Sequence, residues 1–173
     1  MTSRCEECGF DADSVTPELA APAIRDFGRR YRAPLTRLLK GEDESVLRTR
    51  PAEGVWSAIE YAGHVRDVFQ LFDRRVAHML AEDDPVLELI DTDALVRDGD
   101  YRSLGPVAVA DELAAAADTF AARLEGLTPD QWERAGTREG EHRTVLIMAR
   151  RGVHEGSHHL LDIGRVLRAV RQS

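Results

Sequence analysis

The sequence predicts an all-α protein, namely a four-helix bundle with a long crossover loop between its second and third helices. Four long segments carry apolar residues at the three- and four-residue spacing of an amphipathic helix. Alternation with a period of two does not extend beyond a few residues, so strands should be few or absent. Residues 82–105 are acidic and rich in turn-forming residues. A connection of this length suits a crossover that joins two helices running in the same direction.

The first helix is predicted from about Thr16 to Lys40, where apolar side chains recur at helical spacing. Pro34 lies inside this segment and should kink or split the helix, because proline lacks a backbone N–H. Gly41 follows, and glycine is common just past the end of a helix.

The second helix has the clearest start signal, in the segment WSAIEY. Ser57 suits the N-cap position, and Glu60, three residues later, completes a capping box. Trp56 and Tyr61 can pack against each other across this cap as a hydrophobic staple. The helix is predicted to continue to about Ala81.

The last two helices have weaker but similar signals. The third begins at Pro106, a residue favoured in the first turn, and ends near Gly126. Thr128 and Gln131 form a second capping box, which predicts a short helical turn. The fourth helix is predicted to start near Thr144 and to run almost to the last residue.

The composition indicates a single bundle domain over residues 16–173, preceded by an N-terminal C-x-x-C segment over residues 1–15. The chain of 173 residues is 43% apolar and 31% charged, a balance typical of globular proteins. Its net charge of −8, with both signs mixed, argues against a nucleic-acid partner. No apolar run is long enough to cross a membrane, and the first residues lack the apolar core of a signal peptide, which favours the cytoplasm.

The segment GVHEGSHHLLDIGR contains H-E-x-x-H at His154, Glu155 and His158, which read literally is a zinc-protease motif. On a helix the two histidines share a face and can bind one ion. The extended protease motif needs glycine at position 161 and a ligand at 164, where this chain has Leu161 and Gly164. No downstream helix supplies a glutamate, and no sheet edge is expected for a peptide. The sequence therefore argues against a protease, and Glu155 is expected to point away from the ion.

A third ligand must then come from upstream, where the candidates are His64, His78, His142 and the cysteine pair. His64 lies on the well-anchored second helix. With the H-x-x-x-H pair it would provide three neutral nitrogen ligands inside a bundle and leave positions open for catalysis. His78 and His142 are expected at the surface.

Cys5 and Cys8 are the only cysteines, and C-x-x-C-G forms a compact knuckle that can present two sulfurs to one metal. Three interpretations stay open. The pair binds a second metal with histidines or with a partner chain, or one cysteine approaches the three-histidine ion, or the pair belongs to a redox-sensitive or inert tail. His159 is a candidate partner for a cysteine site on spacing alone.

The segments VWSAIEYAGHVRDVF and VHEGSHHLLDIGRVL resemble the DinB-like superfamily of four-helix bundles. This group includes mycothiol- and bacillithiol-type thiol S-transferases and the relatives of mycothiol-dependent maleylpyruvate isomerase. The segments CEECGFD and LTPDQWER resemble its actinobacterial variant. The resemblance implies metal ligands at His64, His154 and His158, which hold a divalent zinc or nickel ion completed by water. It also implies that the ion lowers the pKa of a small thiol. Dimers are common in this family, so a homodimer is a candidate assembly.

Two further residues are candidates for roles around the ion. His159 lies about 100° round the helix from His158, so the two cannot face one ion equally well. His159 is a candidate for a place behind the ligands or in the substrate pocket, and is otherwise a packing or surface residue. Asp162 follows His158 by one turn and could orient a ligand histidine through a hydrogen bond.

The sequence predicts a metal-dependent enzyme that transfers a thiol such as mycothiol to an electrophilic small molecule, or uses that thiol to isomerise a substrate. The thiolate is the reactive nucleophile, and a metal produces it at neutral pH. Two alternatives stay open. One is a hydrolase that uses metal-bound hydroxide, and the other is a non-catalytic binding or stress protein stabilised by its metal.

Overall fold

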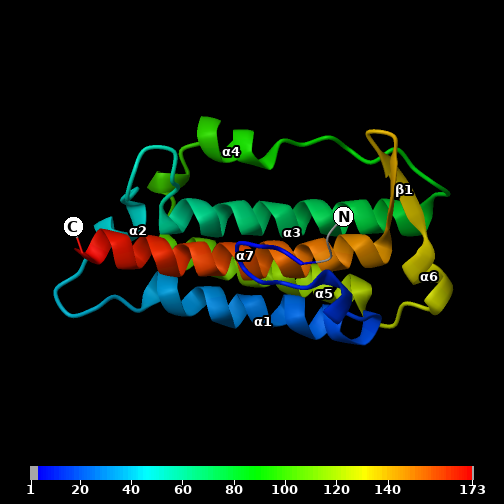
Figure 1. Ribbon diagram of the computed structural model, residues 1–173, viewed down its shortest axis with the longest axis horizontal. Coiled ribbons are helices and arrows are strands. Elements are labelled where there is room, and N and C mark those ends of the chain that lie inside the picture. Colours follow the sequence, from blue (N-terminus) through cyan, green and yellow to red (C-terminus); the bar gives the residue numbers. More distant parts are fainter. Residues whose placement is uncertain (1–3, 173) are drawn as a thin grey trace.

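Four long helices pack side by side in the computed structural model, which describes residues 4–172. They are α1 (Pro17–Thr36), α3 (Ala58–Ala81), α5 (Pro106–Leu124) and α7 (Val145–Gln172). In Figure 1, α3 and α5 run in the same direction, and α1 and α7 run in the opposite one. The predicted all-α four-helix bundle with a crossover between its second and third long helices is therefore confirmed.

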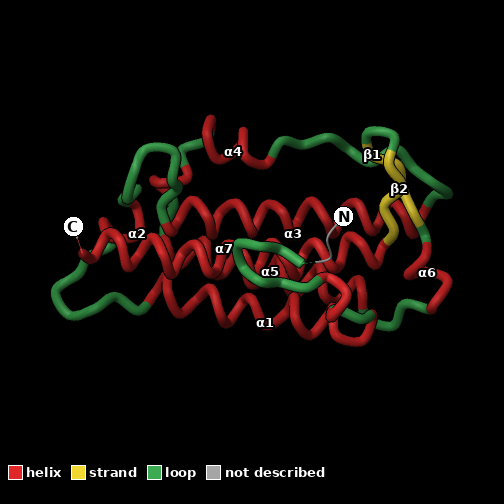
Figure 2. The backbone as a smooth tube through the Cα atoms, in the orientation of Figure 1, coloured by secondary structure: helices red, strands yellow, loops and turns green. Residues whose placement is uncertain are grey.

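The short elements lie at the ends and on the outside of the bundle (Figure 2). The helical ones are η1 (Ala12–Ser14), α2 (Ser45–Arg48), α4 (Thr92–Asp98), η2 (Tyr101–Ser103) and α6 (Pro129–Glu133). Strands β1 (Ala135–Arg138) and β2 (Glu141–Thr144) form an antiparallel hairpin that leads into α7. The expectation of few strands agrees with this single hairpin among the described residues.

The start of α3 is built as its sequence predicts. The backbone N–H and the hydroxyl of Ser57 each lie 2.8 Å from Glu60 Oε2, so the carboxylate holds the N-cap. The rings of Trp56 and Tyr61 lie 5.3 Å apart across this cap. Because this helix start is fixed, the side chain of His64, one turn after Glu60, has a fixed place along the bundle.

Helix α1 is shorter than predicted, because it ends at Thr36 rather than near residue 40. Pro34 lies in its last turn, and the next residue after the helix, Arg37, has already left the helical conformation (φ −106°, ψ 85°). Gly41 takes a positive φ of 90° in the turn that follows, a conformation that glycine adopts without strain.

Two glycines of α7 let this helix approach its neighbours closely. A Cβ atom at Gly156 would lie 2.5 Å from the ring of Phe27 on α1, and one at Gly152 would lie 2.7 Å from the ring of Phe120 on α5. The hydroxyl of Tyr31 donates a hydrogen bond of 2.8 Å to the carbonyl of Gly156. The glycine stripe therefore marks the face of α7 that packs into the bundle.

The crossover, residues 82–105, runs back along the outside of α3 before α5 begins (Figure 1). The ring of Tyr101 lies over Gly63 of α3, where a Cβ atom would come within 2.7 Å of it. The hydroxyl of Tyr101 also donates a hydrogen bond to Asp67. These contacts hold the crossover, and with it α4, against the outer face of α3.

Within residues 4–172 we find no helix that is both long and apolar enough to cross a membrane.

Candidate functional site

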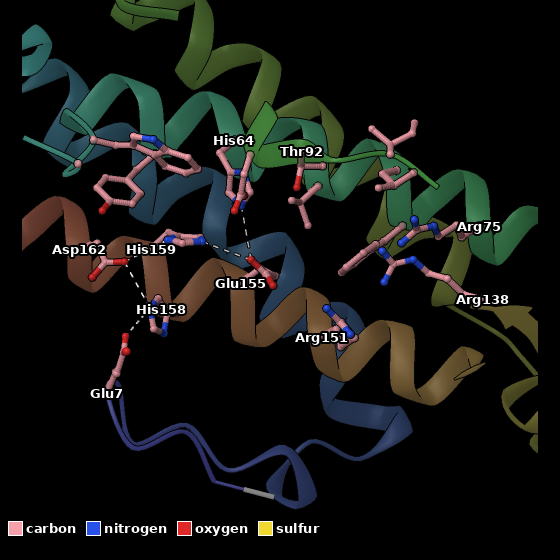
Figure 3. A pocket seen from close by; sticks show the side chains of 18 residues that line it. Glu7, His64, Arg75, Thr92, Arg138, Arg151, Glu155, His158, His159 and Asp162 are labelled. Carbon is pink, nitrogen blue, oxygen red and sulfur yellow. Dashed lines mark hydrogen bonds and ion pairs between the residues drawn. The ribbon is translucent and has the colours of Figure 1, made fainter. Parts of the chain in front are cut away.

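A cavity of about 590 Å³ opens between α3 and α7, under the crossover and beside the N-terminal segment. Figure 3 shows that polar and charged side chains point into it from both helices. Its wall combines aromatic, imidazole, carboxylate and guanidinium groups, contributed by Trp56, Tyr61, Phe72, His64, His158, His159, Glu7, Asp93, Glu155, Asp162, Arg75, Arg138 and Arg151.

Three of these side chains converge from two helices. His64 Nε2 of α3 lies 3.6 Å from Glu155 Oε2 of α7, and His159 Nε2 lies 3.3 Å from the same oxygen. One potential ligand atom from each of the three residues lies within 4.8 Å of the others. His64 is only 4% exposed, and its Nδ1 atom is buried without a hydrogen-bond partner. Two imidazoles and a carboxylate suit zinc and similar divalent ions, so these residues fit a metal centre.

The ligand candidates are held in place from behind. His159 Nδ1 lies 3.1 Å from Asp162 Oδ2, which directs the opposite nitrogen, Nε2, toward Glu155. The ring of Tyr61 stacks on His159 at a centroid distance of 5.3 Å, and the ring of Trp56 lies 5.2 Å from His64. The staple that starts α3 therefore also restricts both imidazoles.

The carboxylate and imidazole of this group favour each other's charged forms. Burial alone would raise the pKa of Glu155, but the hydrogen bonds and charges of His159 and His64 outweigh it and hold that pKa well below its ordinary value. Burial likewise opposes charge on His159, yet Glu155 and Asp162 raise its pKa. The charge of Glu155 is therefore available to a cation.

His154 and His158 lie on the neighbouring face of α7, beside the cysteine knuckle. One ligand atom from each of Cys5, Cys8, His154 and His158 lies within 4.8 Å of the others. Cys5 Sγ is 3.7 Å from His158 Nδ1. The backbone N–H groups of Cys8 and Glu7 lower the pKa of the Cys5 thiol to about 7.

The structure thus divides the predicted ligand trio between two groups. His64 joins Glu155 and His159, whereas His154 and His158 join the cysteines. The physical reason is the helical turn of about 100° per residue, which separates the H-x-x-x-H pair from the E-x-x-x-H pair one position later. Glu155 does not point away from the site, contrary to expectation, but faces His64 and His159.

The sequence contains a signal for the pair Glu155 and His159. Gly152 and Gly156 mark the packed face of α7, and Glu155 and His159 follow them by three residues each, which places this pair at the edge of that face. His78 and His142 lie on the surface, 41% and 69% exposed, and pair with Glu82 and Asp84.

Three arginines gather at the end of the cavity nearest β1 (Figure 3). Arg75 of α3 is 5% exposed, and its Nε atom, like that of Arg138 of β1, is buried without a hydrogen-bond partner. Burial and the charges of Arg138 and Arg151 lower the pKa of Arg75 to about 10. Neither Arg75 nor Arg151 forms a salt bridge with any carboxylate in residues 4–172. Arg138 forms an ion pair with Glu139 at 3.5 Å, so the positive charge that lacks a carboxylate partner among the described residues here is that of Arg75 and Arg151.

Two solved structures share this fold. One is described as YfiT from Bacillus subtilis, a probable metal-dependent hydrolase with an unusual four-helix bundle topology. It gives a TM-score of 0.78 at 19% identity, over 88% of this chain and 86% of that one. The other is the mycothiol-dependent maleylpyruvate isomerase, with a TM-score of 0.65 at 14% identity, over 88% of this chain and 62% of that one. At these identities the likeness concerns the fold.

The sequence itself places the chain among known families. A comparison with curated proteins finds no significant match. Residues 29–163, which are most of the chain, match the family model of the DinB superfamily. The protein therefore belongs to the DinB superfamily.

Proposed function

We propose that the protein is a metal-dependent enzyme in which His64, Glu155 and His159 hold a divalent ion. The observation that carries this proposal is the convergence of the three side chains on the wall of one cavity. Three protein ligands leave coordination positions free, which is the pattern of catalytic rather than structural metal sites. When bound, such an ion lowers the pKa of a coordinated thiol or water and so supplies a nucleophile at neutral pH.

The residues around the proposed ligands fix the orientation of the His64 and His159 side chains. Asp162 accepts a hydrogen bond from His159 Nδ1, which keeps the lone pair of Nε2 directed at the centre. Trp56 and Tyr61 limit rotation of His64 and His159 and shield them from water. Fixed ligands of this kind lower the reorganisation needed when a substrate arrives.

The electrophile is proposed to be a small anion. Arg75 and Arg138 each present a buried, unpartnered Nε atom, and Arg151 adds a third positive charge to the same end of the cavity. A guanidinium group binds a carboxylate or phosphate with two hydrogen bonds in a fixed geometry. An anion bound there would lie along α7 from the metal ligands, since Arg151 precedes Glu155 by one turn.

We propose a small thiol such as mycothiol as the nucleophile, joined to the electrophile or used to isomerise it. A cavity of about 590 Å³ is large enough for a small molecule with part of a second one. The mycothiol-dependent isomerase, which shares the fold, uses that thiol. Water is the alternative nucleophile, favoured by the higher TM-score of the probable hydrolase YfiT, 0.78 against 0.65 for the isomerase.

The test is a nucleophile competition with metal-loaded protein and a panel of α,β-unsaturated and halogenated carboxylic acids. We expect metal-dependent turnover only when mycothiol is present, detected as a thiol adduct or an isomerised acid by mass spectrometry. Turnover without any thiol would move the assignment to a hydrolase. No turnover across the panel, with a melting temperature that collapses on chelation, would leave the metal as a stabiliser.

Matched variants separate the ligands from surface histidines. His64→Ala and Glu155→Gln should lose the activity and one bound ion, because each removes a ligand. His78→Ala, on the same helix as His64 but exposed, should retain both. Equal activity of Glu155→Gln and wild type would contradict the proposed ligand set.

A further inference from the structure

The N-terminal knuckle brings two sulfurs to the face of α7 that carries His154 and His158, next to the face that carries Glu155 and His159. Cys5 N–H donates a hydrogen bond to the carbonyl of Phe10, and Gly9 N–H donates one to the carbonyl of Cys5. Each bond is 2.8 Å long. Gly9 adopts a φ of 73°, which closes the turn after the second cysteine. These bonds form a tight loop, and both cysteines are half-buried as free thiols.

We propose that Cys5, Cys8, His154 and His158 form a second metal site, a closed tetrahedral zinc site that fastens the N-terminal segment to α7. One ligand atom from each residue lies within 4.8 Å of the others. Zinc–sulfur and zinc–nitrogen bonds of about 2.3 and 2.0 Å place ligand atoms roughly 3.5 Å apart in a tetrahedron. Small side-chain rotations therefore suffice to bind the ion.

The two histidines are oriented for this role. His154 Nε2 is buried without a hydrogen-bond partner, and Phe10 of the knuckle stacks on the His154 ring at 5.1 Å and 16°. His158 Nδ1 faces Cys5 Sγ at 3.7 Å. His158 Nε2 lies 3.4 Å from Asp162 and 3.3 Å from Glu7, so a carboxylate can accept its N–H and leave Nδ1 free for the ion.

The ligand chemistry selects the ion and the role of the site. Two thiolates and two neutral imidazoles balance the charge of Zn²⁺, and binding releases two thiol protons. Sulfur ligands favour zinc over magnesium or calcium. Four protein ligands leave no position for a substrate, so this site is structural. It contributes to folding by joining residues that are 153 positions apart in the sequence.

Asp162 links this site to the first one. Its Oδ2 atom lies 3.1 Å from His159 Nδ1 and 3.4 Å from His158 Nε2, so one carboxylate orients a histidine of each group. Arg165 donates a hydrogen bond of 3.1 Å to Asp162 Oδ1 and another of 3.0 Å to the carbonyl of Glu7. Asp162 therefore supports both the proposed zinc site and the first metal site.

The test counts ions and identifies thiolate ligands in the full-length protein. Reduced wild-type protein reconstituted with Zn²⁺ should hold two ions per chain by plasma mass spectrometry. The double variant Cys5→Ser, Cys8→Ser should hold one, and His64→Ala should hold the other. With Co²⁺, wild type and His64→Ala should show the near-ultraviolet thiolate-to-metal band that the cysteine variant lacks. His78→Ala serves as the control with two ions and the band.

Each other outcome decides between the two sites. One ion in wild type, kept in the cysteine variant and lost in His64→Ala, overturns the second site and leaves the catalytic proposal intact. If wild type holds one ion and only the cysteine variant loses it, the second site is supported and the proposal for the first site is contradicted. A Cys5–Cys8 disulfide in zinc-loaded protein also overturns it. If the cysteine variant loses its helical circular dichroism, the variant His154→Gln takes its place in the test. It should hold one ion, and retention of both ions in His154→Gln would contradict the second site.

Discussion

Glu60 is a buried carboxylate, 2% exposed, that fixes the start of α3 and so the level of His64 in the bundle. It holds the N-cap Ser57 from one side and forms an ion pair with the guanidinium of Arg50 from the other. Burial alone would raise its pKa, but the bonds from Arg50 and Ser57 outweigh burial and lower it. The folded state therefore favours the charged form of this residue.

We expect Glu60→Gln to destabilise the fold by about 1–3 kcal/mol at neutral pH, since it leaves buried donors and Arg50 without their partner. Because the pKa of Glu60 is lower in the folded than in the unfolded chain, its contribution is present above its ordinary value of 4.5 and is lost as the pH falls through the folded pKa. Urea denaturation at neutral and acidic pH measures this. Glu44→Gln, at an exposed pair, should change little. A pH-independent difference would contradict the explanation.

Helix α7 is the element that organises both candidate sites. Two interleaved pairs spaced by four residues, His154 with His158 and Glu155 with His159, direct two ligand sets to neighbouring faces. The close packing of Gly152 and Gly156 fixes the rotation of α7, and so decides which of these faces lies beside His64 and which beside the cysteines. The position of the proposed metal ligands therefore depends on the packing of two glycines.

We expect Gly156→Ala to destabilise the protein by about 1–3 kcal/mol, because its Cβ atom would lie 2.5 Å from the ring of Phe27 and force the helix outward. The same shift should weaken metal binding at Glu155. Gly164→Ala on the same helix has open space around it and should stabilise the protein by about 0.5–1 kcal/mol. Thermal unfolding of the two variants with matched metal content tests this, and equal effects would refute the packing argument.

The sequence predicts the elements of this molecule directly, whereas the grouping of its candidate ligands depends on how the helices pack. Periodicity and two capping boxes located the helices, and the length of residues 82–105 indicated the crossover, because these signals are local or depend only on chain length. The ligand partition depends on the rotation of α7 about its own axis. That rotation is set by contacts with Phe27 and Phe120, which lie far away in the sequence. The H-x-x-x-H spacing alone could not distinguish two adjacent faces.

At the scale of the whole molecule, an acidic chain with a net charge of −8 keeps three arginines together in one cavity. The charged form of Arg75 is disfavoured in the folded state, because burial and its positive neighbours lower its pKa to about 10. The unfolded chain binds this proton more tightly than the folded one. The resulting loss of stability is therefore full below about pH 10 and is relieved as the pH rises through that value.

We expect Arg75→Met to raise the melting temperature at neutral pH by a few degrees, because it removes a buried charge that lacks a carboxylate partner. The same variant should lose the stabilisation that we expect a dicarboxylate such as maleate to give the wild-type protein. Differential scanning fluorimetry across maleate concentrations measures both effects. Arg74→Met, at an exposed pair with Glu88, is the control and should retain the response to maleate. A variant that is less stable but still binds maleate would contradict the anion site.

The placement of four proposed ligands in α7 also has a consequence for biosynthesis. The ribosome makes His158 153 residues after Cys5. At about 5–20 residues per second, the nascent cysteines wait roughly 8–30 s for their histidine partners. Over that interval α1, α3 and α5 can assemble, but neither ligand set is complete. By this proposal the ions bind only after α7 has been synthesised, and until α7 docks the two thiols of the emerging chain have no histidine partners.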